Sequence, residues 1–204
     1  MLNESSDSPT SRAQQREEQR RRILSIALSE FLQHGFHGTS TRSITRRAEV
    51  SSGLLFHYFA SKEAVYEELV RIGCSHLAFD AEAAAADPLG FLRSSVVDTL
   101  EMLRAHPETA QFFLFIDQAQ RAPGITPGAD ALLAAHQIID LTAPVFAAGQ
   151  RAGVVRDGDP LAVSLAFWSV LQGIAQELLV RPDLPLPEPE WILAMVRPDT
   201  VPRP

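Results

Sequence analysis

Apolar residues recur three and four positions apart through most of the chain, which is the spacing of amphipathic helices. The pattern predicts helices over residues 16–34, 40–48, 52–59, 62–86, 89–105, 107–120, 129–150, 160–180 and 190–196. Gly35, Asp87-Pro88 and the Pro- and Gly-rich residues 121–128 are expected to end helices. A bend is expected near Pro144, and the run at 112–116 predicts a helix that is buried on all sides. The chain is therefore expected to be all-α, with about nine helices.

Two short helices near the N-terminus are separated by only three residues, Glu49-Val50-Ser51. Ser40 can cap the first helix, and Ser51 or Ser52 can cap the second, because a hydroxyl accepts from the free N–H groups of a first helical turn. Ile44 and Leu55 are expected to be buried. A helix, a tight turn and a second helix form the arrangement that places the second helix in the major groove of DNA.

The charge of the chain, −7 overall, is unevenly distributed. Residues 12–62 carry nine Lys or Arg against four Asp or Glu, a balance of +5, whereas residues 71–204 carry nine against sixteen. Attraction to phosphates acts over about 10 Å at moderate salt, so the basic segment decides whether DNA is bound. Its arginines at 12, 16 and 20–22 are either a solvated helix start or an arm that touches DNA.

The stretch from Thr39 to Lys62 resembles the DNA-reading segment of the tetracycline-repressor (TetR) family of bacterial regulators. The string GLLFHYFASKE is close to the family signature, and the resemblance covers about fifty residues with the preceding helix. Glu49 stands where the family usually has Gly, Thr45 where it has Ala, and Phe56 where it has Tyr. These three positions depart from the family pattern. The residues that carry the resemblance are Phe36, Thr39, Ser40, Thr41, Ile44, Ala48, Val50, Ser51, Gly53, Leu55, Tyr58, Phe59, Ser61, Lys62 and Glu63.

The resemblance implies a ligand-responsive transcriptional repressor that binds a palindromic operator as a homodimer. Residues 1–15 are expected to be a disordered basic arm. Residues 16–62 are expected to be a three-helix, helix-turn-helix DNA-binding domain, and residues 63–204 a helical domain for effector binding and dimerisation.

Eight residues are expected to contact DNA. Arg42 can bond a guanine through two atoms, Gly53 allows close approach of the backbone, and Leu54 can touch a thymine methyl. By similarity to the family, four of the eight are expected at phosphates, although the alternatives are a half-buried Tyr58 ring, an exposed neutral His57 and an exposed Lys62. The full set is Thr41, Arg42, Ser52, Gly53, Leu54, His57, Tyr58 and Lys62, and the four phosphate residues are Thr41, His57, Tyr58 and Lys62.

The resemblance also implies a cavity for a hydrophobic effector and a dimer interface in the last two helices. Each pocket residue has ordinary core packing as its alternative. The expected pocket residues are Phe79, Leu100, Leu103, Phe112, Phe113, Ile116, His136, Phe146, Trp168 and Gln172. The expected interface residues are Leu161, Leu165, Leu171, Leu178, Trp191, Ile192 and Met195, because large apolar residues in these helices have nowhere to pack in a lone monomer.

Two other functional classes remain as alternatives. An enzyme is disfavoured because the sequence has no Gly-rich phosphate loop, nucleophile elbow or strong metal motif. His34-x-x-His37 is a weak metal pattern and Asp157-Gly-Asp159 is more typical of a turn, so no metal or cofactor is expected. The second alternative is a DNA-bound dimer without an effector. The single cysteine, Cys74, and the lack of an eighteen-residue apolar run predict a cytoplasmic protein with no membrane partner.

Overall fold

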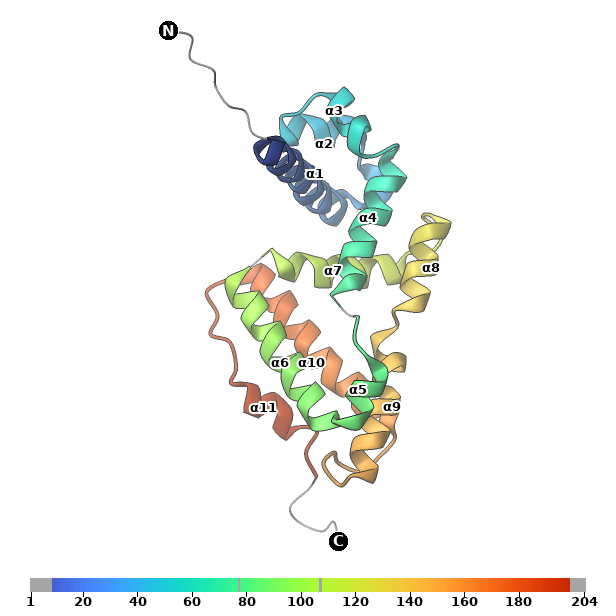
Figure 1. The fold of residues 1–204 in the computed structure, drawn as a ribbon, viewed down its shortest axis with the longest axis vertical. Coiled ribbons are helices and arrows are strands. Elements are labelled where there is room, and N and C mark those ends of the chain that lie inside the picture. The colour runs from blue at the N-terminus through green and yellow to red at the C-terminus, as the bar shows by residue number, and fades with distance from the viewer. Residues whose placement is uncertain (1–8, 77, 107, 199–204) are drawn as a thin grey trace. The chain divides into compact units, whose positions relative to one another are not determined.

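The computed structural model describes residues 9–76, 78–106 and 108–198, and this part of the chain consists of helices joined by turns (Figure 1). The predicted all-α class is therefore confirmed. The chain divides into two compact units, Met1–Leu69 and Val70–Pro204. The boundary falls inside helix α4 (Lys62–Ser75), which begins in the first unit and ends in the second.

The first unit contains α1 (Pro9–Gly38), α2 (Thr41–Ala48), α3 (Ser52–Tyr58) and the start of α4. Gly35, where the sequence predicts a helix end, has φ 67° and ψ 175° and interrupts α1 before a final turn to Gly38. The expected disorder over residues 1–15 differs from the structure, because residues 9–15 are already helical. Residues 1–8 lie outside the described part of the chain.

The core of the first unit is made by one face of each helix. Ile23, Ala27 and Phe31 of α1 are buried at helical spacing. They are joined by Ile44 of α2 and Leu55 of α3, both fully buried. Because these two residues come from the two short helices, the core fixes the angle between the helices as well as their position on α1.

A buried carboxylate joins α1 to α2. The Glu30 side chain is buried, with 3% of the residue exposed, and it accepts from Arg47 Nη1 at 2.5 Å. The Ser43 hydroxyl, and to a lesser degree the Arg47 guanidinium, hold the pKa of Glu30 below its ordinary value of 4.5 against the opposing effect of burial. Since both partners belong to α2, the carboxylate holds that helix against α1.

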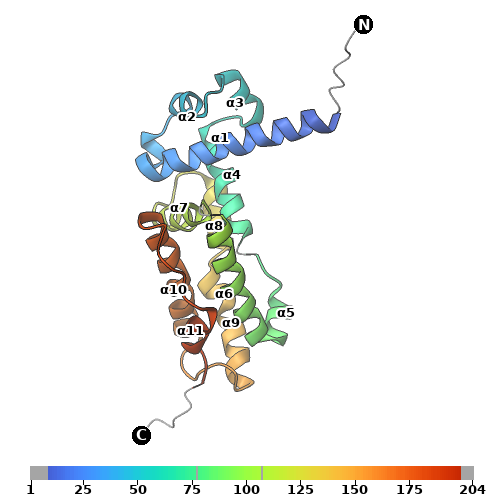
Figure 2. The ribbon, with the colours of Figure 1, turned by 90° about the vertical axis from the view of Figure 1, so that its left-hand side faces the viewer.

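The second unit contains α5 (Ala81–Ala86), α6 (Pro88–Ala105), α7 (Thr109–Arg121), α8 (Pro127–Ala135), α9 (Ile138–Arg151), α10 (Pro160–Val180) and α11 (Pro189–Ala194). Its main core cluster joins four helices and the turn after α9. In both ribbon views α11 lies beside α6 and α10 (Figures 1 and 2). The cluster consists of Leu92, Val96, Leu100, Phe146, Val155, Phe167, Leu171, Ile192, Leu193 and Val196.

Three predicted helices differ from the structure. The single helix expected over residues 62–86 is broken after Ser75, and Asp80 caps a new helix by accepting from the N–H groups of Glu82 and Ala83. The helix expected over residues 129–150 is broken at His136 and Gln137, whereas Pro144 lies inside α9. The helix expected to be buried on all sides, α7, is partly exposed at residues 111–114, and Phe112 and Phe113 of this turn line a cavity.

Two segments of the second unit, Pro127–Arg151 and Pro160–Val180, are apolar enough by length and composition to cross a membrane. The first is interrupted between α8 and α9. The second is α10, whose buried face, Ser164, Phe167, Leu171 and Ala175, packs into the helical unit. Such segments are also typical of core helices, so they are weak evidence for a membrane location.

Replacing Glu30 by Gln should lower the free energy of unfolding at neutral pH by about 2 kcal/mol, because the hydrogen bonds to the carboxylate charge are lost. A carboxylate whose pKa is lowered by folding stabilises the fold above its unfolded pKa, and this contribution disappears as the pH falls through the folded pKa. The difference between wild type and variant should therefore shrink below about pH 4.5. Denaturant titrations across pH measure it, and a constant difference would contradict the assignment.

Candidate functional site

The helix pair α2 and α3 is built by local hydrogen bonds at each helix start. Ser40 and Ser43 form a capping box, in which the Ser40 hydroxyl accepts from Ser43 N at 3.0 Å and the Ser43 hydroxyl accepts from Ser40 N at 3.2 Å. The Ser51 hydroxyl accepts from Leu54 N at 3.1 Å. The expected caps and the three-residue break are therefore present, with Phe59 as the C-cap of α3.

The turn between the two helices depends on a left-handed residue. Glu49 has φ 53° and ψ 41°, a conformation that costs a non-glycine residue about 1 kcal/mol. Its N–H bonds the carbonyls of Thr45 and Arg46, and its carboxylate accepts from Arg22 Nη2 of α1 at 2.7 Å. The residue that replaces the family's usual glycine thus gains an ion pair that partly neutralises its charge.

The outer face of α3 is made of small, polar and aromatic groups. Ser52, Gly53 and His57 are exposed, while Leu54 and Tyr58 are half-buried. Phe56, which was not among the expected site residues, is 51% exposed on this helix. It follows Ser52 and Gly53 by four and three residues, so the helical spacing already places it on their face.

On α2, Arg42 is exposed and Thr41 is half-buried at the first turn. Arg42 makes no ion pair within the described part of the chain, so its guanidinium is available to a ligand. Tyr58 lies beside His57 at a ring distance of 5.3 Å, and its hydroxyl approaches Gln19 of α1 at 3.4 Å. The expected DNA-binding residues, Lys62 excepted, thus lie on or beside exposed parts of α2 and α3.

Lys62 is placed differently from the expectation. Its ammonium donates to the carbonyl oxygens of Phe36 at 2.8 Å and Thr39 at 2.9 Å, and it lies 4.0 Å from the centre of the Phe36 ring. The ammonium therefore joins the start of α4 to the final turn of α1 and to the link between α1 and α2. Two of the three N–H donors of the ammonium are used within the protein. This indicates that Lys62 helps to position α2.

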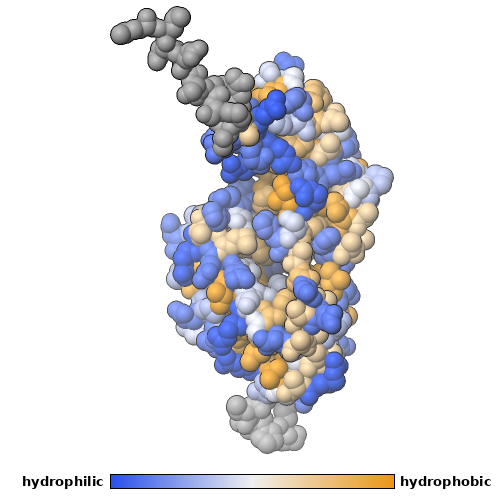
Figure 3. All heavy atoms as spheres, in the orientation of Figure 1, coloured by the Kyte–Doolittle hydropathy of each residue, from blue (hydrophilic) through white to orange (hydrophobic). Residues whose placement is uncertain are grey.

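The arginines of α1 also divide into exposed side chains and one that is bonded within the protein. Arg16, Arg21 and Arg22 are exposed, and Figure 3 shows a largely hydrophilic surface over α1. Arg20 instead bonds Glu68 of α4 and lies 5.6 Å from the centre of the Phe59 ring. The Arg12 side chain lies outside the described residues.

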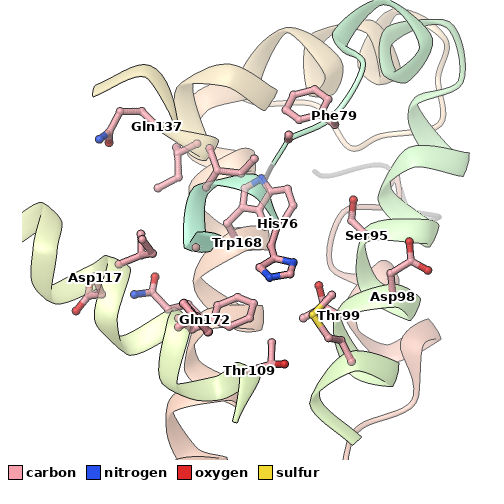
Figure 4. A pocket seen from close by; sticks show the side chains of 18 of the residues that line it. His76, Phe79, Ser95, Asp98, Thr99, Thr109, Asp117, Gln137, Trp168 and Gln172 are labelled. Carbon is pink, nitrogen blue, oxygen red and sulfur yellow. The ribbon is translucent and has the colours of Figure 1, made fainter. Parts of the chain in front are cut away.

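The second unit contains a partly open cavity of about 330 Å³ between the end of α4, α6, α7, α10 and the segments that precede α5 and α9. This volume is in the range of small-molecule sites. Its wall combines aromatic rings, among them Phe79 and Phe91 at a ring distance of 4.9 Å, with hydroxyl, amide and carboxylate groups (Figure 4). His76, Ala78 and Phe79, which lie at the break between α4 and α5, form part of the wall.

Close packing fixes two walls of the cavity. A Cβ at Gly73 would lie 2.6 Å from the Ile116 side chain, so any larger residue there would force that side chain to shift. On another wall, Trp168 Nε1 donates to the Thr142 hydroxyl at 2.8 Å, and that hydroxyl lies 2.9 Å from the Ser164 hydroxyl. This network joins α9 to α10 and fixes the Trp168 ring.

The structure brings only part of the expected pocket set together. Leu100 and Phe146 lie in the main core, and Leu103 lies in a second core cluster, because these residues occupy the opposite faces of their helices. His136 is the C-cap of α8 and bonds the Leu132 carbonyl. The expected residues that line the cavity are Phe79, Phe112, Phe113, Ile116, Trp168 and Gln172.

Polar lining residues were missed, chiefly on α6. Ser94, Ser95, Asp98 and Thr99 share the helix face opposite the buried leucines, and this polar face can be read from their spacing in the sequence. Cys74 is buried beside the cavity wall, and burial raises the pKa of its thiol to about 11, which makes it unreactive. In the described ranges no group of three metal-binding side chains occurs.

The expected dimer residues divide between surface and core. Leu171 and Ile192 belong to the core of their own unit, which corrects their assignment to an interface, and Leu178 is half-buried beside the second core cluster. The remaining expected interface residues, Leu161, Leu165, Trp191 and Met195, are exposed apolar residues.

Comparison with known proteins identifies the family. Residues 23–69 match the model described as bacterial regulatory proteins of the tetR family. The chain is 30% identical to the HTH-type transcriptional regulator RutR of Escherichia coli K12 over 155 residues, which are 75% of this chain and 72% of RutR. The chain belongs to the TetR family. It is therefore a sequence-specific DNA-binding transcriptional regulator and not an enzyme.

Other TetR-family proteins are similar over different lengths. The HTH-type transcriptional repressor KstR2 of Mycobacterium tuberculosis H37Rv is 34% identical over 103 residues, 48% of this chain and 50% of KstR2. The MbdR regulator from Azoarcus sp. CIB has the same fold with a TM-score of 0.66 at 17% identity, covering 87% of this chain and 97% of MbdR. AibR, solved with isovaleryl coenzyme A and operator DNA, has a TM-score of 0.64 at 19% identity, covering 86% and 94%.

The position of Lys62 yields a prediction that separates folding from DNA contact. Lys62→Ala should lower the free energy of unfolding by about 1–3 kcal/mol, because it removes two charge-assisted hydrogen bonds. It should leave the slope of log affinity against log salt unchanged, since a structural ammonium releases no counterion from DNA.

Arg21→Ala is the matched control, because it removes one positive charge from an exposed position of α1. Chemical denaturation and DNA titrations at several salt concentrations give both quantities. An unchanged stability with a salt slope reduced by about one would restore Lys62 to the phosphate contacts.

Proposed function

We propose that this TetR-family regulator is a repressor that binds a palindromic operator as a homodimer and releases it when a small molecule occupies the cavity. The exposed outer face of α3, held by its own cap and by the core, supports DNA reading through that helix. The proposed base-reading residues are Arg42, Ser52, Gly53 and Leu54, with Thr41, His57 and Tyr58 at phosphates. Because the proposed target is chromosomal DNA, we expect the protein to act in the cytoplasm.

Two observations support repression over activation: a bound dimer obstructs a promoter, and a similar protein is a repressor. A dimer that covers a promoter blocks polymerase, and KstR2 is named a repressor. The cavity supports effector control over the alternative of a DNA-bound dimer without a ligand. A ligand that binds better to one separation of the two DNA-reading heads shifts the population toward that separation. Release of DNA then follows from the difference between the ligand's affinities for the two states.

An exposed row on α10 supports the dimer. Leu161, Leu165, Ser169 and Gly173 follow one another at four-residue spacing and are all exposed. A Cβ at Gly173 would meet nothing within 4 Å, so another helix has room to approach there. In a two-fold dimer the same row meets its copy, and the half-sites of the operator mirror that symmetry.

Selection of bound fragments from genomic DNA tests the DNA-reading part of the proposal. The wild type should enrich one inverted repeat, with affinity that falls steeply with salt. Arg42→Ala should relax the preference at one base position in each half-site by about 1–3 kcal/mol, because a bidentate contact to guanine is lost.

The alternative outcomes are distinct. Equal loss of affinity on all sequences would place Arg42 at a phosphate. No enrichment at low salt would contradict operator binding by the protein as isolated, and a copurified ligand would then be sought by mass spectrometry. An operator complex that no bound small molecule weakens would favour the dimer without an effector.

Leu165→Glu should convert the dimer to the monomer of 22.4 kDa, because each copy would bury an unpaired carboxylate at the interface, at a cost of about 3 kcal/mol or more. Leu165 is 51% exposed in the single chain, so the monomer should keep its fold. Leu141→Glu on α9 is the control, since Leu141 is similarly exposed. Sedimentation equilibrium gives the mass, and a dimeric Leu165→Glu variant would exclude this row from the interface.

A further inference from the structure

Apart from His76, the ionisable side chains that line the cavity are carboxylates. Among its described lining residues are two carboxylates, Asp98 and Asp117, and neither lysine nor arginine. A carboxylate or phosphate ligand would therefore lack a permanent positive partner at the wall. A positively charged ligand, in contrast, would find an opposite charge without any rearrangement of the protein.

The two carboxylates are not equivalent. Asp117 is already neutralised by Arg121, whose Nε and Nη2 donate to it at 3.0 and 2.9 Å. Asp98 makes no hydrogen bond or ion pair within the part of the chain that the structure describes. Figure 4 shows Asp98 with Ser95 and Thr99 on one side of the cavity, Asp117 on the opposite side, and Trp168 and His76 between them.

Several hydrogen-bond donors of the wall are already used within the protein. Trp168 Nε1 donates to Thr142, the Ser95 hydroxyl donates to the Phe91 carbonyl at 2.9 Å, and Gln137 Nε2 donates to the Leu133 carbonyl at 2.9 Å. These three donors are therefore not free for a ligand, whereas uncharged donors such as Gln172 and Thr99 remain at the wall. The Asp98 carboxylate, which only accepts when ionised, remains for a ligand that donates.

The remaining wall suits the body of such a ligand. Phe79, Phe91, Phe112, Phe113 and Trp168 supply aromatic rings. Ring faces attract cations as well as apolar groups, and the attraction is stronger where water is excluded. With its N–H bonded to Thr142, the Trp168 ring can meet the ligand only through its π system and its carbon edge.

We propose that the effector is an aromatic amine or a similar organic cation, with its positive group at Asp98 and its ring system against the aromatic wall. The inference rests on the proposed function of the cavity as an effector site and specifies the ligand class. An organic cation at this site explains why the wall combines many aromatic rings with an unpaired carboxylate and has neither lysine nor arginine.

Three probes with the same bicyclic ring and different charge test the ligand class: 1-naphthylmethylamine, 1-naphthylmethanol and 1-naphthoic acid. Isothermal titration calorimetry of the full-length protein at neutral pH should give the order amine, alcohol, acid, with the amine roughly tenfold tighter than the alcohol. Asp98→Asn keeps the side-chain shape and should abolish the difference between amine and alcohol.

Glu101→Gln is the matched control, because it removes the same charge from an exposed position of α6 outside the lining. It should keep the preference for the amine. Thermal unfolding of each variant without ligand confirms that the unit is intact, which is expected because Asp98 is an exposed residue of α6.

The outcomes separate this inference from the proposed function. Equal binding of amine and alcohol, tightest binding of the acid, or an unchanged preference in Asp98→Asn would overturn the cationic class and leave the effector site standing. Failure of all three probes to bind would overturn the inference as well. An Asp98-dependent preference for the amine without any loss of operator affinity would support the ligand class and contradict effector-controlled release.

Discussion

The ammonium of Lys62 holds together the three segments on which the DNA-reading unit depends. Its carbonyl partners, those of Phe36 and Thr39, lie between the interruption of α1 and the first residue of α2. The direction in which α2 leaves this segment decides where the turn at Glu49 and the following α3 lie. The ammonium thus adds to the buried contact of Leu55, the one buried side chain of the seven-residue α3, in positioning that helix.

The first unit repeatedly uses charged side chains for internal contacts. Glu30 holds α2 from within the core, Arg20 bonds Glu68 across to α4, and Arg22 offsets the carboxylate of Glu49. These pairs reduce the number of basic groups that can meet phosphates below the number that composition suggests. Affinity for DNA then depends more on the exposed arginines, such as Arg42, than on the total positive charge of the segment.

Helix α10 has two distinct faces, one toward the core and the cavity and one exposed. One face supplies Phe167 and Leu171 to the core, and Trp168 beside them forms part of the cavity wall. The opposite row, with Leu165 and Gly173, is exposed and suited to a second copy. In the dimer and effector site proposed above, α10 would contact both the ligand and the partner subunit, so a rotation of this helix would change both contacts together.

The sequence by itself determined the features that neighbouring residues decide. The caps at Ser40 and Ser51, the break at residues 49–51, the stop at Gly35 and the apolar stripes follow from contacts within a few positions, so they could be predicted. Only the tertiary structure decided that α4 ends before His76, that Leu171 faces inward while Leu165 faces outward, and that Asp98 borders a cavity. These outcomes depend on contacts between residues far apart in the chain, such as those that Lys62 makes, and local spacing carries no information about them.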